Sequence, residues 1–185
     1  MKAEIRIHIG EYHASRKPTV IQTVLGSCVA VCLFDPVKRI GGMNHILLPG
    51  QADLKHFDVS ARYGINAMEL LINKMMGLGA NPNRFVAKVF GGAHVIPAIS
   101  RENGTGKKNT GFALEFLQKE NIEVLSKNIG GGDSRKVYFH TDTADVFVKK
   151  IPPMLQAHIA KRESTTFRSI QKEVHRCGEV TLFKD

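Results

Sequence analysis

Cysteine is scarce in this 185-residue chain, and long hydrophobic runs are absent. Three cysteines are too few for the disulfide framework that stabilises many small secreted proteins. The longest stretch without a charged side chain, residues 18–34, is at the lower limit of a membrane span and is interrupted by proline, glycine and polar residues. Charged residues near the N-terminus stand where a secretion signal needs an apolar run. We therefore expect a cytoplasmic protein, not embedded in a membrane, whose thiols are free.

Acidic residues are outnumbered, since 26 lysines and arginines accompany 17 aspartates and glutamates and give a net charge of +9. A charge of this size favours an anionic partner but says nothing about the fold. The excess is largest in residues 149–176, where seven basic residues accompany two acidic ones. Pro152 and Pro153 interrupt regular structure near the start of this segment. We expect a compact domain at residues 1–151 and a basic, helical C-terminal tail at residues 152–185.

Two common cofactor motifs are incomplete. The segment Gly104–Lys107 resembles the end of a phosphate-binding loop, but Arg101 replaces the first glycine, and Lys108 replaces the serine or threonine that would bind magnesium. Cys28 and Cys32 are four residues apart, yet no second cysteine or histidine pair follows at zinc-finger spacing. We therefore expect neither a cofactor nor a metal.

Apolar periodicity predicts many strands and few helices. Apolar residues between positions 65 and 76 recur at spacings of three and four, which predicts a helix that ends at Gly77 and Gly79. A second helix is predicted through residue 119. Strands are predicted at residues 20–24, 29–34, 40–48, 84–90, 122–125, 136–140 and 146–151. This pattern indicates an α+β fold in which helices cover a sheet or a sandwich.

One cysteine stands where a catalytic thiol could be held. Cys28 follows the small residues Gly26 and Ser27 at the junction of two apolar segments, so backbone N–H groups can approach its sulfur. Such a junction can expose a side chain while holding it rigidly, so we expect Cys28 to be an accessible thiol of low pKa that alkylates before Cys32. The next histidine downstream, His45, lies in the following predicted strand, and a turn between the strands would bring the two together. A thiolate nucleophile needs such a base, and N–H groups for a developing oxyanion. From these residues alone, a structural Cys28 and a hydrogen-bonded core histidine remain the alternative, and Cys32 is expected to be a core residue.

Longer segments around this pair carry a family resemblance. Residues 23–33 read TVLGSCVAVCL and residues 41–49 read GGMNHILLP. Shorter matching segments are RYGINAME at 62–69, KVFGGA at 88–93, and a Gly-Gly followed by Arg-Lys-Val within 131–137. Together these segments resemble the CheD family, the chemoreceptor glutamine deamidases of bacterial chemotaxis, over about residues 5–151.

The resemblance implies a fold, an activity and a set of site residues. The fold would be a mixed β-sandwich with helices packed outside, in α/β/β layers, similar to the catalytic domain of cytotoxic necrotizing factors. The activity would be hydrolysis of selected glutamine side chains in chemoreceptors to glutamates, with release of ammonia. Cys28 would be the nucleophile and His45 the acid and base, and a threonine upstream of the cysteine would complete the catalytic residues. Backbone N–H groups near Gly26 and Ser27 would hold the oxyanion.

The position of that threonine is where the chain departs from the family pattern. Some members place it six residues before the cysteine, which here is Gln22, whereas this chain has Thr23 five residues before. Neighbouring residues of a strand face opposite ways, so only one of the two side chains faces the site. Either can accept the histidine N–H through an oxygen atom. We assign the role of orienting His45 to Thr23 and keep Gln22 as the alternative.

The resemblance also implies two protein partners. The cytoplasmic domains of methyl-accepting chemoreceptors would be the substrates, and a CheC-type phosphatase would be a second partner. We expect the basic tail to aid docking or stability and to hold no catalytic residue. Its aromatic residues, Phe167 and Phe183, are far apart, so nucleic-acid binding is not expected. A non-catalytic chemotaxis regulator, or another cysteine hydrolase such as a peptidase or transglutaminase, remains an alternative function.

Replacing Thr23 with valine and Gln22 with leucine tests the assignment, because each change removes the polar atoms at similar size. We expect Thr23→Val to lose most of the ammonia release from a receptor cytoplasmic fragment, and Gln22→Leu to retain it. The opposite pattern would make Gln22 the orienting residue.

Overall fold

The computed structural model describes residues 2–48, 50–95 and 104–176, and within them nine strands form two sheets. A four-stranded sheet has the order β1-β3-β8-β9, and a five-stranded sheet has the order β2-β5-β4-β6-β7. The strands are β1 (Ala3–Arg6), β2 (Tyr12–Ser15), β3 (Thr19–Leu25), β4 (Val29–Asp35), β5 (Ile40–Asn44), β6 (Val86–Gly91), β7 (Glu123–Ile129), β8 (Arg135–His140) and β9 (Val146–Lys150).

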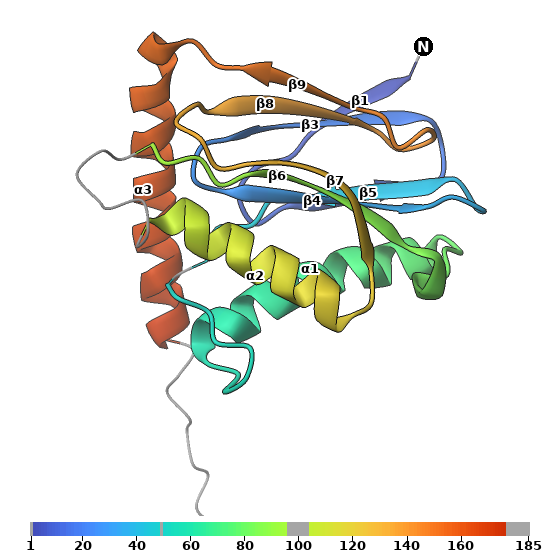
Figure 1. Ribbon diagram of the computed structural model, residues 1–185, viewed down its shortest axis with the longest axis horizontal. Helices are drawn as coiled ribbons and strands as arrows, with labels where there is room; N and C mark the ends of the chain where they lie inside the picture. The colour runs from blue at the N-terminus through green and yellow to red at the C-terminus, as the bar shows by residue number, and fades with distance from the viewer. Residues whose placement is uncertain (1, 49, 96–103, 177–185) are drawn as a thin grey trace, which may run out of the picture.

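Three α-helices complete the described fold: α1 (Val59–Gly77), α2 (Thr105–Lys119) and α3 (Pro153–Arg176). A short 3₁₀ helix, η1 (Pro82–Arg84), precedes β6. Figure 1 shows α1 and α2 covering the outer face of the five-stranded sheet, which lies against the four-stranded sheet on its other side. The helix α3 runs across one end of both sheets. The predicted α+β class is confirmed, with two sheets and helices outside them.

The strand β4 separates two hydrophobic cores because its side chains alternate between its two faces. Val29, Val31 and Leu33 belong to the core between the five-stranded sheet and helices α1 and α2. Cys28, at the start of the strand, belongs with Ala30 and Cys32 to the core between the two sheets. Cys32 is therefore a buried core residue, as predicted, with 1% of its surface exposed.

Most predicted elements are present, with shifted ends. The first helix begins at Val59, earlier than its apolar pattern suggested, because the Asp58 carboxylate caps it by accepting a hydrogen bond from the Ala61 N–H at 2.7 Å. The strand predicted at 40–48 ends at Asn44. The short strands β1 and β2 were not predicted, since they are only four residues long and largely exposed or half-buried.

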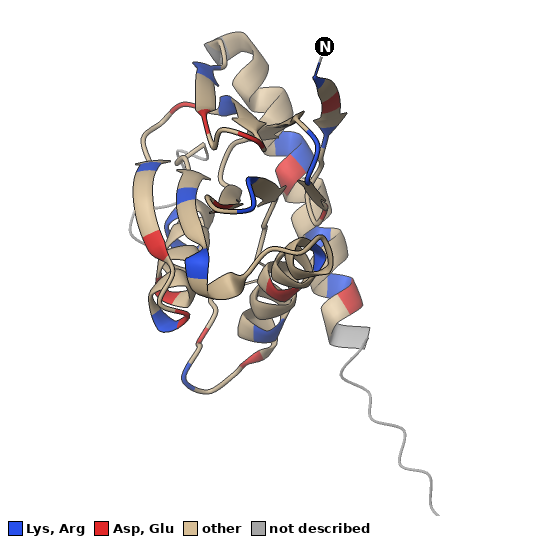
Figure 2. Ribbon diagram, turned by 90° about the vertical axis from the view of Figure 1, so that its right-hand side faces the viewer, with Lys and Arg blue, Asp and Glu red and all other residues tan. Residues whose placement is uncertain are grey.

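The C-terminal segment predicted to be a basic helix contains α3. Half-buried Phe167 and Val174 and buried Ile170 pack against the core between the sheets. Figure 2 shows Lys and Arg interspersed with Asp and Glu over several elements. Among the described helices, none is long and apolar enough to cross a membrane.

A glycine at the end of β6 lets the backbone approach Cys28 closely. Gly91 pairs with Val29 and has a φ of +110°, and the next N–H, of Gly92, donates to the Cys28 carbonyl at 2.7 Å. A Cβ at position 91 would overlap that carbonyl oxygen. The Ala93 N–H donates to the Gly26 carbonyl at 2.8 Å. The end of β6 thus fixes both ends of the turn that carries Cys28.

We expect Gly91→Ala to lower the free energy of unfolding by at least about 2 kcal/mol, because a left-handed φ costs a side chain roughly 1–3 kcal/mol before the overlap is counted. The matched control is Gly111→Ala in α2, where an added Cβ meets nothing within 4 Å. Alanine there should stabilise the protein by up to about 1 kcal/mol. Urea unfolding of both variants measures the difference; equal stabilities would contradict the steric argument.

Candidate active site

Three side chains singled out in the sequence meet at one end of the sandwich. Thr23 lies in β3, Cys28 in the turn from β3 into β4, and His45 directly after β5. All three are buried, with exposed fractions of 1%, 0% and 3%. The two sheets therefore each contribute to one cluster, which combines a thiol, an imidazole and a hydroxyl.

The antiparallel register of the two strands places His45 on the same face as Cys28. Beyond the end of β5, a bridge pairs Val29 with Ile46. Residues opposite each other in an antiparallel pair point to the same face, and their neighbours point to the other. Cys28 and His45 each precede one member of that bridge, so both side chains enter the space between the sheets.

Thr23 fixes the ring of His45 through a chain of hydrogen bonds. The Thr23 hydroxyl donates to the Ile7 carbonyl at 2.8 Å, and its oxygen lies 2.8 Å from His45 Nδ1. Because the hydroxyl proton is directed to Ile7, the hydroxyl oxygen accepts from Nδ1–H, which leaves Nε2 unprotonated. Buried Nε2 has no hydrogen-bond partner among the described residues. An unprotonated Nε2 is the nitrogen that can take a proton from a thiol.

The environment of His45 keeps its imidazole neutral. Burial lowers the pKa of His45 to about 3, and the nearby side chains of His8 and Arg162 act in the same direction. At pH 7 the ring is therefore a base with a vacant nitrogen rather than an imidazolium ion.

Gln22 points away from the cluster. Its side-chain nitrogen lies 3.4 Å from a carboxylate oxygen of Glu4 in β1. Its neighbour Ile21, like Leu25, enters the core between the sheets. The pairing of β3 with β8 is regular through this region, so no bulge turns Gln22 toward the side of Thr23. Of the two candidates, the structure brings Thr23 to His45.

Cys28 is not the accessible, low-pKa thiol that its small neighbours suggested. It is fully buried, and burial raises the pKa of the Cys28 thiol well above its ordinary value. The negative charge of Glu163 and a hydrogen bond with it raise that pKa further. Burial also raises the pKa of Cys32. The expectation of accessibility is wrong for this conformation because α3 covers the site.

The helix α3 brings a carboxylate that the sequence analysis missed. The Gly26 N–H donates to one oxygen of Glu163 at 2.8 Å, and the Ser27 N–H and hydroxyl both donate to the other at 2.7 Å. The Cys28 N–H lies 3.4 Å from the first oxygen. These are the same backbone groups expected to hold an oxyanion. The tail, which we expected to aid docking or stability, therefore also contacts the site.

A sequence signal for Glu163 did exist. It precedes Phe167 by four residues and Ile170 by seven, a spacing that places all three on one side of a helix. A single carboxylate on an otherwise apolar face needs a buried partner. The partner, however, lies more than 130 residues away in the chain, and nothing in the local pattern identifies it.

The chemistry of the cluster fits a bound carboxylate. One atom each of Cys28, His45 and Glu163 lies within 4.8 Å of the others, and zinc accepts such a sulfur, nitrogen and oxygen set. Both oxygens of Glu163, however, already accept short hydrogen bonds from backbone N–H groups. Converging N–H donors stabilise negative charge on an oxygen. The arrangement can therefore bind a carboxylate product or the oxyanion of an acyl-transfer reaction.

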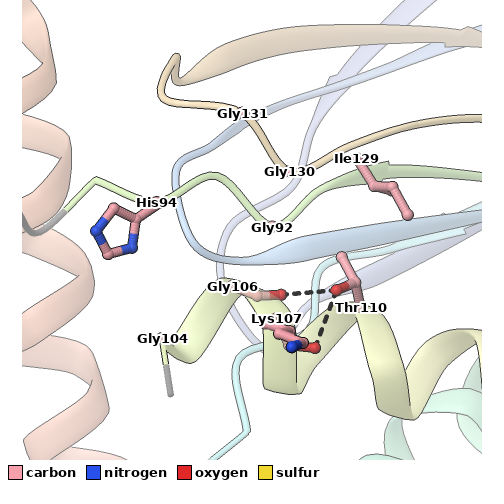
Figure 3. A pocket seen from close by; sticks show the side chains of 9 residues that line it. All are labelled: Gly92, His94, Gly104, Gly106, Lys107, Thr110, Ile129, Gly130 and Gly131. Carbon is pink, nitrogen blue, oxygen red and sulfur yellow. Dashed lines mark hydrogen bonds between the residues drawn. The ribbon is translucent and has the colours of Figure 1, made fainter. Parts of the chain in front are cut away.

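The glycine-rich segment Gly104–Lys107 lies at a different hollow, shown in Figure 3. This cavity of about 230 Å³ lies between the start of α2, the end of β6 and the turn after β7. The Thr110 hydroxyl is directed at the carbonyls of Gly106 and Lys107, at 2.9 and 3.0 Å. Arg101 lies outside the described residues. The described lining holds no cysteine or carboxylate, and this hollow adds nothing to the cluster around Cys28.

Comparison with known proteins connects this geometry to a family. The family model described as CheD chemotactic sensory transduction matches residues 47–150. The chain is 46% identical over 184 residues to the probable chemoreceptor glutamine deamidase CheD 1 of Shewanella oneidensis, which covers 98% of this chain and 88% of that protein.

Two further relatives extend the comparison. The probable chemoreceptor glutamine deamidase CheD of Thiobacillus denitrificans is 43% identical over 176 residues, covering 94% of this chain and 86% of that protein. The protein of the same name from Vibrio vulnificus is 36% identical over 187 residues, with coverages of 97% and 86%. A model match over more than half of the chain and these nearly full-length similarities establish that the chain belongs to the CheD family.

Proposed function

We propose that this protein hydrolyses selected glutamine side chains of chemoreceptors to glutamates and releases ammonia. One observation carries the proposal: a glutamate side chain, that of Glu163, is held by backbone N–H groups directly beside a cysteine–histidine pair. The product of glutamine hydrolysis is such a side chain. The names of the relatives, probable chemoreceptor glutamine deamidases, support the same reaction and the same class of substrate.

The reaction begins with transfer of the Cys28 Sγ proton to His45 Nε2. The sulfur attacks the glutamine Cδ, and the electron pair of the C=O bond moves to oxygen. The Gly26 and Ser27 N–H groups stabilise that oxyanion. As the carbonyl re-forms, the imidazolium gives its proton to the amide nitrogen, the C–N bond breaks and ammonia leaves.

The second half of the reaction hydrolyses the resulting thioester. His45 takes a proton from water, and the hydroxide oxygen adds to the thioester carbon at the same N–H groups. Collapse of this second oxyanion breaks the C–S bond, the imidazolium returns its proton to Cys28, and the carboxylic acid so formed releases a proton to give a glutamate side chain. Thr23 acts as a positioning residue, because it fixes the His45 tautomer and need not touch the substrate. This cycle uses neither a cofactor nor a metal.

The partners and location follow from the substrate. Receptor cytoplasmic domains place the reaction in the cytoplasm, and the net charge of +9 suits an acidic receptor surface by steering its approach. A CheC-type phosphatase as second partner, a catalytic domain bounded at residue 151, and a fold similar to that of cytotoxic necrotizing factors are parts of the same proposal.

Cys28→Ala should abolish ammonia release from a receptor cytoplasmic fragment, because the substitution removes the nucleophilic sulfur. The fold should stay intact, because alanine keeps the Cβ and differs from cysteine by that one atom. Cys32→Ala is the matched control, since it removes a second buried thiol on the same face of β4. We expect this control to keep its turnover per folded molecule. Ammonia release and peptide mapping of the receptor measure the outcome. Undiminished turnover by the Cys28→Ala variant would refute the proposal, and cleaved or cross-linked receptor would indicate a peptidase or transglutaminase.

The neutral state of His45 also predicts a pH dependence of stability. Because the pKa of His45 falls from 6.5 to about 3 on folding, only the unfolded chain takes up this proton between those values. The free energy of unfolding should therefore decrease as the pH falls below 6.5, by roughly 1 kcal/mol per pH unit from this residue. His45→Asn keeps a polar atom near Thr23 and should lose this dependence, whereas His158→Asn on the exposed side of α3 should retain it. Urea unfolding over a range of about pH 4 to 8 measures both slopes.

A further inference from the structure

The helix α3 places the Glu163 side chain beside Cys28 and His45, where the side chain of a substrate glutamine or a product glutamate would bind. Its carboxylate accepts from the Gly26 and Ser27 N–H groups and from the Ser27 hydroxyl, within 2.8 Å. One of its oxygens, the Cys28 sulfur and a His45 ring nitrogen lie within 4.8 Å of one another. Glu163 is 5% exposed, although Lys161 and Arg162, directly before it, are exposed.

Few of the described side chains of α3 are buried. Ile170 is the other buried residue among the α3 side chains that the structure describes, and Phe167 and Val174 are half-buried against the core between the sheets. Hollows of about 170 and 240 Å³ lie on either side of Glu163, and it lines both. Apart from Glu163 and Ile170, the described side chains of α3 are half-buried or exposed, and Met154 and Leu155 of its first turns are exposed.

We propose that α3 occupies the docking site of a substrate helix, with Glu163 at the position of the target glutamine, so that the chain is held as its own product complex. This inference rests on the proposed function. It specifies the substrate further: a glutamine on a helix, followed by apolar residues four and seven positions later, as Phe167 and Ile170 follow Glu163. Such residues would fill the apolar surface that α3 now covers.

The same arrangement makes α3 a competitor of the substrate. A receptor helix can reach Cys28 only after α3 has left, so the fraction of molecules with an open site limits the apparent affinity. In the closed form, burial and the Glu163 charge raise the pKa of the Cys28 thiol, which also keeps it unreactive. Release of α3 removes the Glu163 charge and uncovers the side of Cys28 that this helix covers.

A glutamine at position 163 would be an intramolecular substrate. In Glu163→Gln, the Cys28 sulfur attacks Cδ of residue 163, the amide nitrogen leaves as ammonia, and water hydrolyses the thioester. The net change consumes one water, and the product is the natural glutamate. We expect the purified full-length variant to carry glutamate at position 163, seen by intact mass and peptide mapping as the mass difference between amide and acid.

Controls for this conversion are present in the chain. Gln156 and Gln171 lie on the same helix and should remain amides. The double variant Glu163→Gln with Cys28→Ala should keep glutamine at all three positions. Conversion that persists without Cys28 would overturn the inference, as would a folded Glu163→Gln protein that keeps its amide while it deamidates receptor fragments. If neither residue 163 nor receptor is converted, the proposed function itself fails.

A second pair of variants tests the docking site without changing Glu163. Phe167→Asp places a charge on the packed side of α3 and should release the helix, whereas Thr165→Asp places it on the exposed side. We expect Phe167→Asp to raise receptor turnover and Cys28 alkylation by iodoacetamide at least several-fold, because more molecules have an open site. Thr165→Asp should leave both rates unchanged. A folded Phe167→Asp protein with unchanged rates would show that α3 does not compete with the receptor.

Discussion

The antiparallel register of β4 with β5 and β6 is the constraint on which the site depends. The register continues through the bridge of Val29 with Ile46, and this places Cys28 and His45 on one face. Two hydrogen bonds tie the turn that carries Cys28 to the residues after β6: the Gly92 N–H donates to the Cys28 carbonyl, and the Ala93 N–H donates to the Gly26 carbonyl. Two neighbouring strands thus fix the Cys28 thiol from both sides, while the N–H groups of Gly26 and Ser27 donate to the Glu163 carboxylate rather than to a strand.

The four-stranded sheet contributes the part of the site that governs protonation. Parallel pairing of β1 with β3 places Ile7, just beyond β1, where its carbonyl accepts a hydrogen bond from the Thr23 hydroxyl. That bond decides which nitrogen of His45 is protonated. The thiol and the imidazole come from one sheet and the residue that orients the imidazole from the other, so the site requires the sandwich to be closed.

Sequence reasoning was strongest where the signal is local. The strand and helix pattern and the turn at Gly26 and Ser27 are readable from neighbouring residues. The pairing of Cys28 with His45 was one of two open alternatives from the residues alone, and the family resemblance favoured it. The choice between Thr23 and Gln22 was not readable from neighbouring residues, because the apolar residues after Thr23 do not reveal which face of β3 is turned inward. The accessibility of Cys28 was predicted wrongly because α3, distant in sequence, covers it.

Closure by α3 also has a consequence for redox chemistry. Oxidation of cysteine to sulfenic acid proceeds through the thiolate, so a buried thiol with a raised pKa reacts slowly with peroxide. A cysteine nucleophile left open to solvent would be exposed to irreversible overoxidation during long idle periods. The helix that carries Glu163 therefore preserves Cys28 in its reduced form, and the protein risks oxidation of that sulfur only while the helix is displaced.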